Sequence, residues 1–237
     1  MELLTVGASF ACFRLLNWEL HRLVPPPSSA LRNPWKWRNI WTSFVHSLIT
    51  GSWALLGFYL HPEMAEDLIS THSLLSRSLV AVSIGYFIHD FLDMLQNQKL
   101  HKSWELLFHH IVVITCFGIS GILRRYVGFA VVALLVEINS IFLHLRQILL
   151  MANLLKTTFY RVNSLLNLGT YVIFRISTLA WMTRWLVLNR DNIPLLIYTI
   201  GSVGMAIMTV MNIILFCRLL RSDFLKSAQD PQCEKEK

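Results

Sequence analysis

Long apolar stretches recur along almost the whole sequence, and only short polar segments separate them. The hydrocarbon core of a bilayer is about 30 Å thick, and a helix needs about 20 residues to cross it. Of the 237 residues, 54% are hydrophobic and 15% are charged, against about 25% charged in typical soluble domains. The sequence therefore predicts an all-α polytopic membrane protein. Transmembrane β-strands would instead give short segments of alternating hydrophobicity.

The apolar stretches predict a bundle of six to seven transmembrane helices. They cover residues 3–20, 40–60, 74–95, 104–123, 126–150, 165–188 and 194–216. The first is the shortest, and Arg14 interrupts it. We expect it to be retained as a signal anchor, because no Lys or Arg precedes its apolar part and no clear small-residue cleavage site follows.

The connections divide the chain into three parts. Residues 1–34 form an anchor helix and a linker that contains Pro25, Pro26 and Pro27. One membrane domain follows over residues 35–223, and residues 224–237 are a polar tail that we expect to be disordered and cytosolic. Tryptophan next to Lys or Arg is typical of a headgroup boundary, as in the segment WKWRNIW at residues 35–41.

The distribution of Lys and Arg in the loops predicts the orientation, because cytosolic loops carry the excess of these residues. With the N-terminus outside, the cytosolic segments hold Arg22, Arg32, Lys36, Arg38, Lys99, Lys102, Lys156, Arg161, Arg218, Arg221, Lys226, Lys235 and Lys237. The other side holds only Arg124, Arg125 and Arg190. We therefore expect a cytosolic C-terminus.

Many polar residues lie inside the predicted spans, where a charged side chain costs roughly 2.5–3.5 kcal/mol on insertion scales. They are His46, His89, Asp90, Asp93, Glu105, His109, His110, Glu137, Asn139, His144, Arg146 and Arg175. With the orientation above, most of them fall in the cytosolic half of the bilayer. We expect them to line a shared cavity.

Helical spacing places several of these groups on common faces. Residues four or seven apart lie on one side of a helix, which applies to Glu105 with His109 and to Glu137 with His144. A third stripe in the segment YFIHDFLD contains Tyr86, His89, Asp90 and Asp93. We expect three helices to present these stripes to one interior.

Proton transfer is the chemistry that such a cavity favours. Histidine titrates near neutral pH, and a neighbouring carboxylate can orient it and raise its basicity. His109 with Asp90 or Glu105 is therefore a candidate pair of a base and its orienting residue. Alternatively, the polar groups only hydrogen-bond across helices, at about 0.6 kcal/mol each.

Other classes of function are disfavoured. The net charge of +7 is explained by the cytosolic loops, and no compact basic patch interleaved with aromatic residues indicates nucleic-acid binding. The cysteines at 12, 116, 217 and 233 are scattered, which argues against a disulfide framework or a zinc site. A metal site from His89, His109, His110 and His144 is also disfavoured, because adjacent helical histidines point about 100° apart.

Three segments resemble landmarks of a known family. GYFIHD, SWELLFHHIVV and LLVEINSIFLHLR occur in this order, and the chain resembles the TLC domain of the TRAM, Lag1 and ceramide-synthase proteins over residues 35–223. The ending CRLLRSDF is similar to small vertebrate members associated with plasma-membrane phospholipid composition and fluidity. The resemblance implies a TLC-domain fold whose helices surround an acyl-chain-sized cavity.

The resemblance also bears on catalysis. In ceramide synthases two adjacent histidines serve catalysis, and His109 and His110 match that pair. At the place of a later His-Asp pair and a further Asp, this chain has Val136-Glu137 and Asn139-Ser140. Glu137 keeps an acid, so the resemblance adds His110 and Glu137 to the catalytic candidates. Because the second histidine is replaced, we do not expect ceramide synthase activity itself.

The leading prediction is a membrane lipid-handling protein that regulates phospholipid acyl composition and membrane fluidity by limiting polyunsaturated chains. Its partners would be membrane lipids and fatty acyl chains, with no cofactor. The alternative is an acyl-CoA-dependent acyltransferase that uses the His109-His110 pair, with acyl-CoA as a substrate. A transporter is disfavoured because no inverted repeat is evident. The resemblance favours the plasma membrane, with the endoplasmic reticulum as the alternative.

Overall fold

The computed structural model describes residues 2–225, and within that range the chain forms helices and no strands. The α-helices are α1 (Glu2–Leu23), α2 (Pro34–Leu60), α3 (Glu63–Glu66), α4 (Leu74–Asn97), α5 (Leu100–Leu123), α6 (Val127–Leu134), α7 (Glu137–Met151), α8 (Thr158–Tyr171), α9 (Thr178–Leu188) and α10 (Leu195–Leu220). The described part of the chain also contains the short 3₁₀ turns η1 (Ser28–Ala30) and η3 (Arg190–Asn192) and the π-helical segments η2 (Val172–Ser177) and η4 (Arg221–Leu225).

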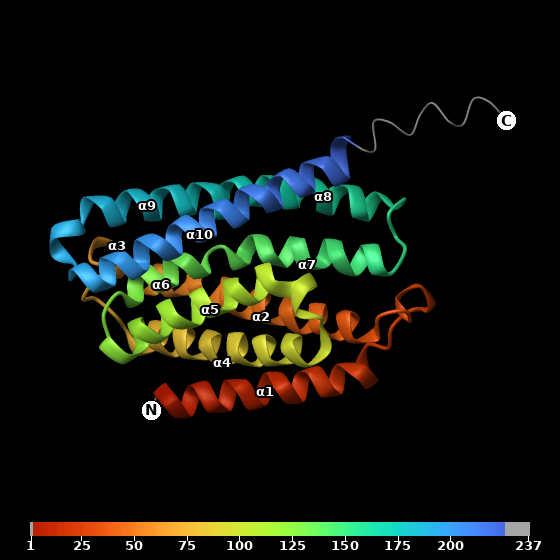
Figure 1. Cartoon of the computed structure of the whole chain (residues 1–237), viewed down its shortest axis with the longest axis horizontal. Helices are drawn as coiled ribbons and strands as arrows, with labels where there is room; N and C mark the ends of the chain where they lie inside the picture. Colours follow the sequence, from red (N-terminus) through yellow and green to blue (C-terminus); the bar gives the residue numbers. More distant parts are fainter. Residues whose placement is uncertain (1, 226–237) are drawn as a thin grey trace.

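Among the described residues, 6 helical segments are long and apolar enough to cross a membrane. They are Pro34–Leu60, Leu74–Asn97, Ser103–Leu123, Val127–Met151, Thr158–Leu188 and Leu195–Asp223. The predicted all-α membrane bundle is confirmed. The helix α1 is not among these segments, because polar residues such as Arg14 and Asn17 lower its hydropathy. It nevertheless runs beside α4 along the bundle (Figure 1).

Most of these helices begin or end beyond the predicted apolar runs. The helix α2 begins at Pro34, six residues before residue 40, because the Asn33 side chain accepts a hydrogen bond from the Lys36 N–H at 3.0 Å and caps the helix. Apolar runs mark the hydrocarbon core, whereas helices continue into the headgroup region. At the other end of the chain, α10 likewise continues through η4 to Leu225. The rest of the predicted tail lies outside the described residues.

Two predicted spans are interrupted in ways that the sequence does not signal. Residues 126–150 form α6 and α7, joined at Leu135 and Val136 by i to i−3 hydrogen bonds. Residues 165–188 belong to a longer helix that begins at Thr158 and contains the π-helical segment η2. Neither break contains Gly or Pro. Both lie near the polar residues described below, as π-helical segments often do at functional sites.

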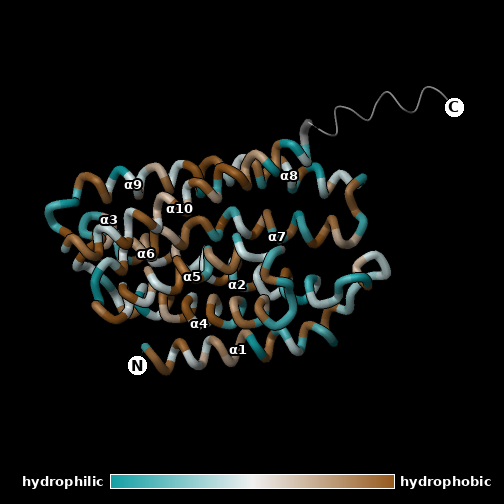
Figure 2. The backbone as a smooth tube through the Cα atoms, in the orientation of Figure 1, coloured by the Kyte–Doolittle hydropathy of each residue, from teal (hydrophilic) through white to brown (hydrophobic). Residues whose placement is uncertain are grey.

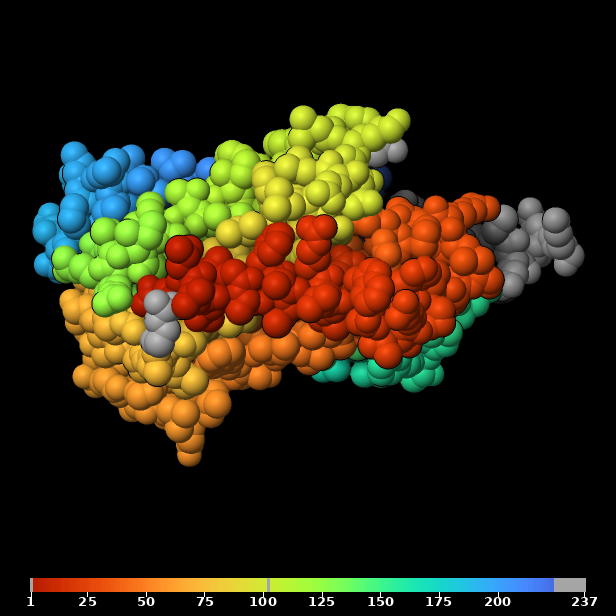
Figure 3. Space-filling model, turned by 90° about the horizontal axis from the view of Figure 1, so that it is seen from below, coloured from red at the N-terminus to blue at the C-terminus, as the bar shows by residue number. Residues whose placement is uncertain are grey.

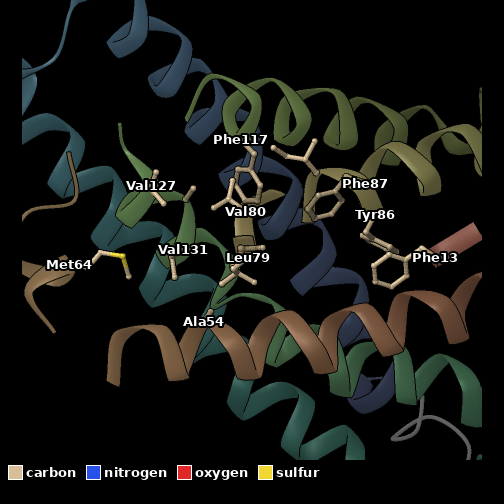
Figure 4. Packing of buried hydrophobic residues seen from close by; sticks show 13 residues of the cluster. Phe13, Ala54, Met64, Leu79, Val80, Tyr86, Phe87, Phe117, Val127 and Val131 are labelled. Carbon is tan, nitrogen blue, oxygen red and sulfur yellow. The ribbon is translucent and has the colours of Figure 1, made fainter. Parts of the chain in front are cut away.

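The core lies between the helices, and much of the outer surface is apolar. Leu79, Phe87, Phe117 and Val131 belong to the main buried cluster (Figure 4). The helices are largely hydrophobic, and hydrophilic residues are frequent in the connections (Figure 2). Large exposed apolar residues include Ile122 and Leu195. Such a surface is expected where a helix bundle faces lipid.

The helix α1 packs closely on α4 because Gly85 has no side chain. A Cβ atom at Gly85 would lie 2.5 Å from the Val6 carbonyl oxygen and 2.9 Å from the Phe10 nitrogen. The Ser9 hydroxyl donates to the Val82 carbonyl oxygen at 2.7 Å across the same contact. The predicted anchor is therefore an integral part of the described bundle.

The connections fall at two ends of the bundle. The α1–α2, α4–α5 and α7–α8 connections share one end with the last residues of α10, and the N-terminal end of α1 lies at the other (Figure 1). This matches the alternation that the loop charges predict. The assignment of the first end to the cytosol stays a prediction.

Candidate functional site

A cavity of about 150 Å³ lies between α5, α6, α9 and α10. Its walls are mostly apolar, as at Val112, Phe129 and Leu186, and they include the π-helical segment η2 and the start of α7. The lining follows α5 from His109 to Ser120, about 16 Å at 1.5 Å per residue. One leaflet of a bilayer contributes about 15 Å of hydrocarbon, so the lining along α5 extends about as far as one leaflet is deep.

His109 is the member of the histidine pair that lines this cavity. Its Nδ1 lies 3.2 Å from the Met208 sulfur on α10, and its ring meets Phe87 edge-on at 6.5 Å between centroids. A thioether is a weak hydrogen-bond acceptor. The imidazole of His109 is therefore held by weak contacts beside the cavity.

His110 points to the other side of α5 and pairs with Asp90 on α4. Its Nε2 lies 2.8 Å from Asp90 Oδ2, and its Nδ1 lies 2.6 Å from the Leu106 carbonyl oxygen. The Asn39 amide donates to the other oxygen of Asp90. Both nitrogens of His110 are thus engaged, and both side chains of the pair are buried.

The predicted pairing of His109 with Asp90 is wrong. Adjacent residues on a helix point about 100° apart, and α4 lies on the side that His110 faces. The sequence places both histidines one helical turn from Glu105 and leaves open which of them meets Asp90. The two rings lie 5.5 Å apart between centroids and are nearly perpendicular at 84°.

Arg175 and Glu137 bring charge to the polar end of the cavity. The Arg175 guanidinium donates to Asn139 Oδ1 at 2.7 Å, to Ser140 Oγ at 2.7 Å and to Asn212 Oδ1 at 2.9 Å. Glu137 Oε2 accepts from the Ser47 hydroxyl at 2.6 Å. Neither charge takes part in an ion pair among residues 2–225.

His46 and Tyr86 are packed in the core. Their rings stack at 3.7 Å with an interplanar angle of 13°, and both residues are buried. Phe13 and Phe87 meet the His46 ring edge-on. This cluster joins α1, α2 and α4. His46, Tyr86 and Phe13 do not line the cavity between α5 and α10, whereas Phe87 does.

The predicted common stripe on α4 is divided in the structure. His89 and Asp93 line a second cavity toward α1 and α2, whereas Asp90 meets α5 and Tyr86 stacks on α2. The i, i+3, i+4, i+7 pattern covers an arc of about 100°. Because α4 is packed between α1 on one side and α5 on the other, that arc faces two different interiors.

The prediction that Glu105 faces the interior is also wrong. Its carboxylate accepts two hydrogen bonds from Arg218 on α10, at 3.0 Å each, and its side chain is 42% exposed. Glu105 lies close to the start of α5, where a side chain can reach the headgroup region. Glu105 and Arg218 therefore form a pair at the rim of the bundle.

Arg146 does not face the cavity either. Its guanidinium pairs with Asp223 and donates to Ser222 Oγ at 3.0 Å, and Tyr160 donates to the same Asp223 at 3.2 Å. These contacts tie α7 and α8 to η4, which follows α10. His144 is half-buried on α7 and, within the described part of the chain, lines neither cavity.

Sequence reasoning missed several partners of the site. They are uncharged side chains on the helices that face it: Asn39, Ser47, Ser140, Met208 and Asn212. Asn212 could have been predicted from the sequence, since it is a lone amide in the apolar run TVMNIILF. Polar residues in such runs often hydrogen-bond across helices.

The described residues contain no cluster of three or more His, Cys, Asp or Glu side chains that could hold a metal ion. The cavity instead combines an apolar chamber with an imidazole, a carboxylate and a guanidinium at one end. Such an arrangement suits a long apolar ligand with a polar head, and the imidazole could accept a proton from it.

Comparison with known proteins identifies the family. The TLC domain matches residues 36–221. The chain belongs to the TLC-domain family. It is 70% identical to TLC domain-containing protein 2 of Danio rerio, over 99% of this chain and 95% of the relative. It is 44% identical to the Homo sapiens protein of the same name, over 97% of this chain and 86% of that one. It is 36% identical to TLC domain-containing protein 1 of Mus musculus, over 99% of this chain and 94% of that relative. TLC-domain membership and the six apolar helices make this a multi-pass membrane protein.

Proposed function

We propose that this TLC-domain protein regulates the acyl composition of membrane phospholipids and keeps the membrane less fluid by limiting polyunsaturated chains. The observation that carries the proposal is the cavity between α5 and α10, with an apolar chamber as long as one leaflet and His109, Glu137 and Arg175 at one end. Its partners are membrane lipids and fatty acyl chains. We assign it to the plasma membrane, with the endoplasmic reticulum as the alternative and the C-terminus in the cytosol.

The shape of the chamber supports selection among acyl chains. Bulky side chains such as Phe117, Phe129 and Trp185 line it together with Gly201 and Gly204. A Cβ at Gly204 would lie 3.4 Å from both Cys116 Sγ and Val112 Cγ1, so the walls are close there. A narrow chamber accepts a straight chain more readily than one bent by several double bonds, because close-packed walls yield little.

The proposal is tested by the phospholipid acyl profile of cells that express His109→Ala, His110→Ala or the wild-type chain at equal abundance. We expect His109→Ala to raise the polyunsaturated fraction to the level of cells without the protein, since it removes the imidazole beside the cavity. His110→Ala breaks the pair with Asp90 and is expected to destabilise the folded chain, so its acyl profile is compared only after its abundance has been matched. Glu105→Gln, which changes only the rim pair, should keep the wild-type profile. A wild-type profile from His109→Ala at equal abundance would end the histidine-dependent form of the proposal.

A second candidate is an acyl-CoA-dependent acyltransferase, and the position of His109 beside the cavity favours it. His109 would take a proton from an acceptor hydroxyl or amine while that oxygen or nitrogen attacks the thioester carbon. The carbon–sulfur bond breaks, an ester or amide forms, and His109 returns the proton to the coenzyme A thiolate. Purified protein with labelled acyl-CoA and candidate acceptors separates the two functions: labelled product identifies an enzyme, and retained but unchanged ligand identifies a binding protein.

A further inference from the structure

A second cavity, of about 180 Å³, lies between α1, α2 and α4. Arg14 from α1, Arg38 from α2 and His89 and Asp93 from α4 line it, and none of its residues lines the first cavity. It lies on the flank of the bundle that α1 crosses, which Figure 3 shows from outside. The proposed function gives this cavity no role.

Two buried nitrogen atoms on its wall have no hydrogen-bond partner among the described residues. His89 is 6% exposed, and its Nε2 is buried and unpartnered. The Nε of Arg38 is buried and unpartnered as well. Burying such a group without a partner is unfavourable, and more so when the group is charged. Two such groups on one small cavity point to a ligand that supplies acceptor oxygens.

The charges on the wall indicate that this ligand is an anion. Neither Arg14 nor Arg38 forms an ion pair within residues 2–225. Asp93 is the only acidic residue in the lining, and its oxygens accept from neutral donors: Trp35 at 2.8 Å, Asn97 at 3.2 Å, and Asn17 and Asn39 at 3.4 Å. Two arginines and one aspartate leave one positive charge, which a phosphodiester would neutralise.

The cavity lies toward the end of the bundle at which α1 ends and α2 begins. Arg38 lies four residues from the start of α2, and Arg14 lies nine residues from the end of α1, or about 6 and 14 Å from that end of the bundle. Long arginine side chains reach outward from such positions. Trp18 lines the cavity, and Arg22 stacks on its ring at 4.6 Å, as is typical of a membrane interface.

Apolar surface lies beside the charged wall. Leu92, a lining residue, is 39% exposed, and Leu15, next to Arg14, is 61% exposed. A free phosphate ion would leave this surface unused, whereas a lipid would cover it with its acyl chains.

We propose that the cavity between α1, α2 and α4 binds the phosphate group of a membrane phospholipid, with Arg14 and Arg38 as charged donors and His89 as a third donor. The lipid lies against α1 and holds that helix to the bundle. This site is independent of the cavity that contains His109.

The test measures thermal unfolding of the full chain, purified in an uncharged detergent, with increasing dihexanoyl-phosphatidylglycerol. Matched titrations use dihexanoylglycerol, which lacks the phosphate, and inorganic phosphate. A ligand that binds only the folded state raises the unfolding temperature with concentration. We expect the phospholipid to stabilise the wild-type chain well below the concentrations at which the other two compounds act.

Two variants connect that effect to the site. Because each charged hydrogen bond is worth at least about a factor of ten in affinity, Arg14→Gln combined with Arg38→Gln should raise the half-effective phospholipid concentration at least about tenfold. Arg14 is exposed and makes no ion pair within the described residues, so Arg14→Gln alone tests the site in a chain that folds normally. The control is Arg161→Gln, an exposed arginine on α8, and it should titrate like the wild type.

Three results would overturn the proposal. If the double variant titrates like the wild type, the arginines do not bind the lipid. If dihexanoylglycerol stabilises as well as the phospholipid does, the phosphate is not recognised. If inorganic phosphate alone is sufficient, the site takes a free anion and not a lipid.

Discussion

At the scale of single residues, the two adjacent histidines have different surroundings. In the described part of the chain, His109 meets the Met208 sulfur and the rings of Phe87 and His110, whereas His110 is fixed through both nitrogens. Sequence reasoning identified both histidines, and also Asp90, because charged and imidazole groups are rare inside apolar runs. It could not assign the partners, because partner choice depends on the rotation of α5 about its axis, which is set by packing.

The His110–Asp90 pair should stabilise the fold far more than the exposed pair of Arg218 and Glu105. The side chains of His110 and Asp90 are 4% and 7% exposed, against 62% and 42% for Arg218 and Glu105. Removing one partner of a buried pair costs about 3–5 kcal/mol, and an exposed pair contributes about 0–1 kcal/mol. We expect Asp90→Ala to lower the free energy of unfolding by several kcal/mol and Glu105→Ala by less than about 1 kcal/mol, as measured by denaturation in mixed micelles. Equal losses of unfolding free energy would show that the buried pair stabilises the fold no more than the exposed pair does.

At the scale of helices, the apolar runs predicted which segments are helical. They did not predict where the regular α-helix is interrupted. The break between α6 and α7 and the π-helical segment η2 orient Glu137 and Arg175. Neither has a helix-breaking residue as a local signal, since the sequence through both is free of Gly and Pro. These bends follow from how the helices pack and from the bonds that Arg175 makes with α7 and α10, so a single helix cannot reveal them.

The contact between α1 and α4 gives a sharp test at this scale. Alanine is favoured over glycine inside a helix by about 1 kcal/mol, so Gly118→Ala, which meets nothing within 4 Å, should leave stability unchanged or raise it. Gly85→Ala places a methyl group against the backbone of Val6 and Phe10 and should lower the unfolding temperature. Scanning both variants in the same detergent provides the comparison, and a Gly85→Ala chain as stable as Gly118→Ala would mean that α1 is not packed there.

At the scale of the whole molecule, the positions of the connections predict an accessibility pattern. With Cys12, Cys116, Cys217 and Cys233 replaced by Ser, single cysteines are introduced at Asp191 and at Lys156. A membrane-impermeant maleimide should label the first in intact cells and the second only after permeabilisation, because these connections lie at opposite ends of the bundle (Figure 1). The reverse pattern would invert the orientation that the loop charges predict.

The central claim also belongs to the scale of the whole molecule. It is that the chamber between α5 and α10 controls which acyl chains enter phospholipids. Gly201 lines this chamber, and a Cβ there lies 3.7 Å from Leu186, so Gly201→Phe should fill it. Gly169 on α8 has open space around it, and Gly169→Phe is the matched control. The decisive measurement is the polyunsaturated fraction of phospholipids in cells that express each variant at equal abundance. The Gly201→Phe cells should match cells without the protein, and the Gly169→Phe cells should match the wild type. A wild-type fraction in the Gly201→Phe cells would contradict the account.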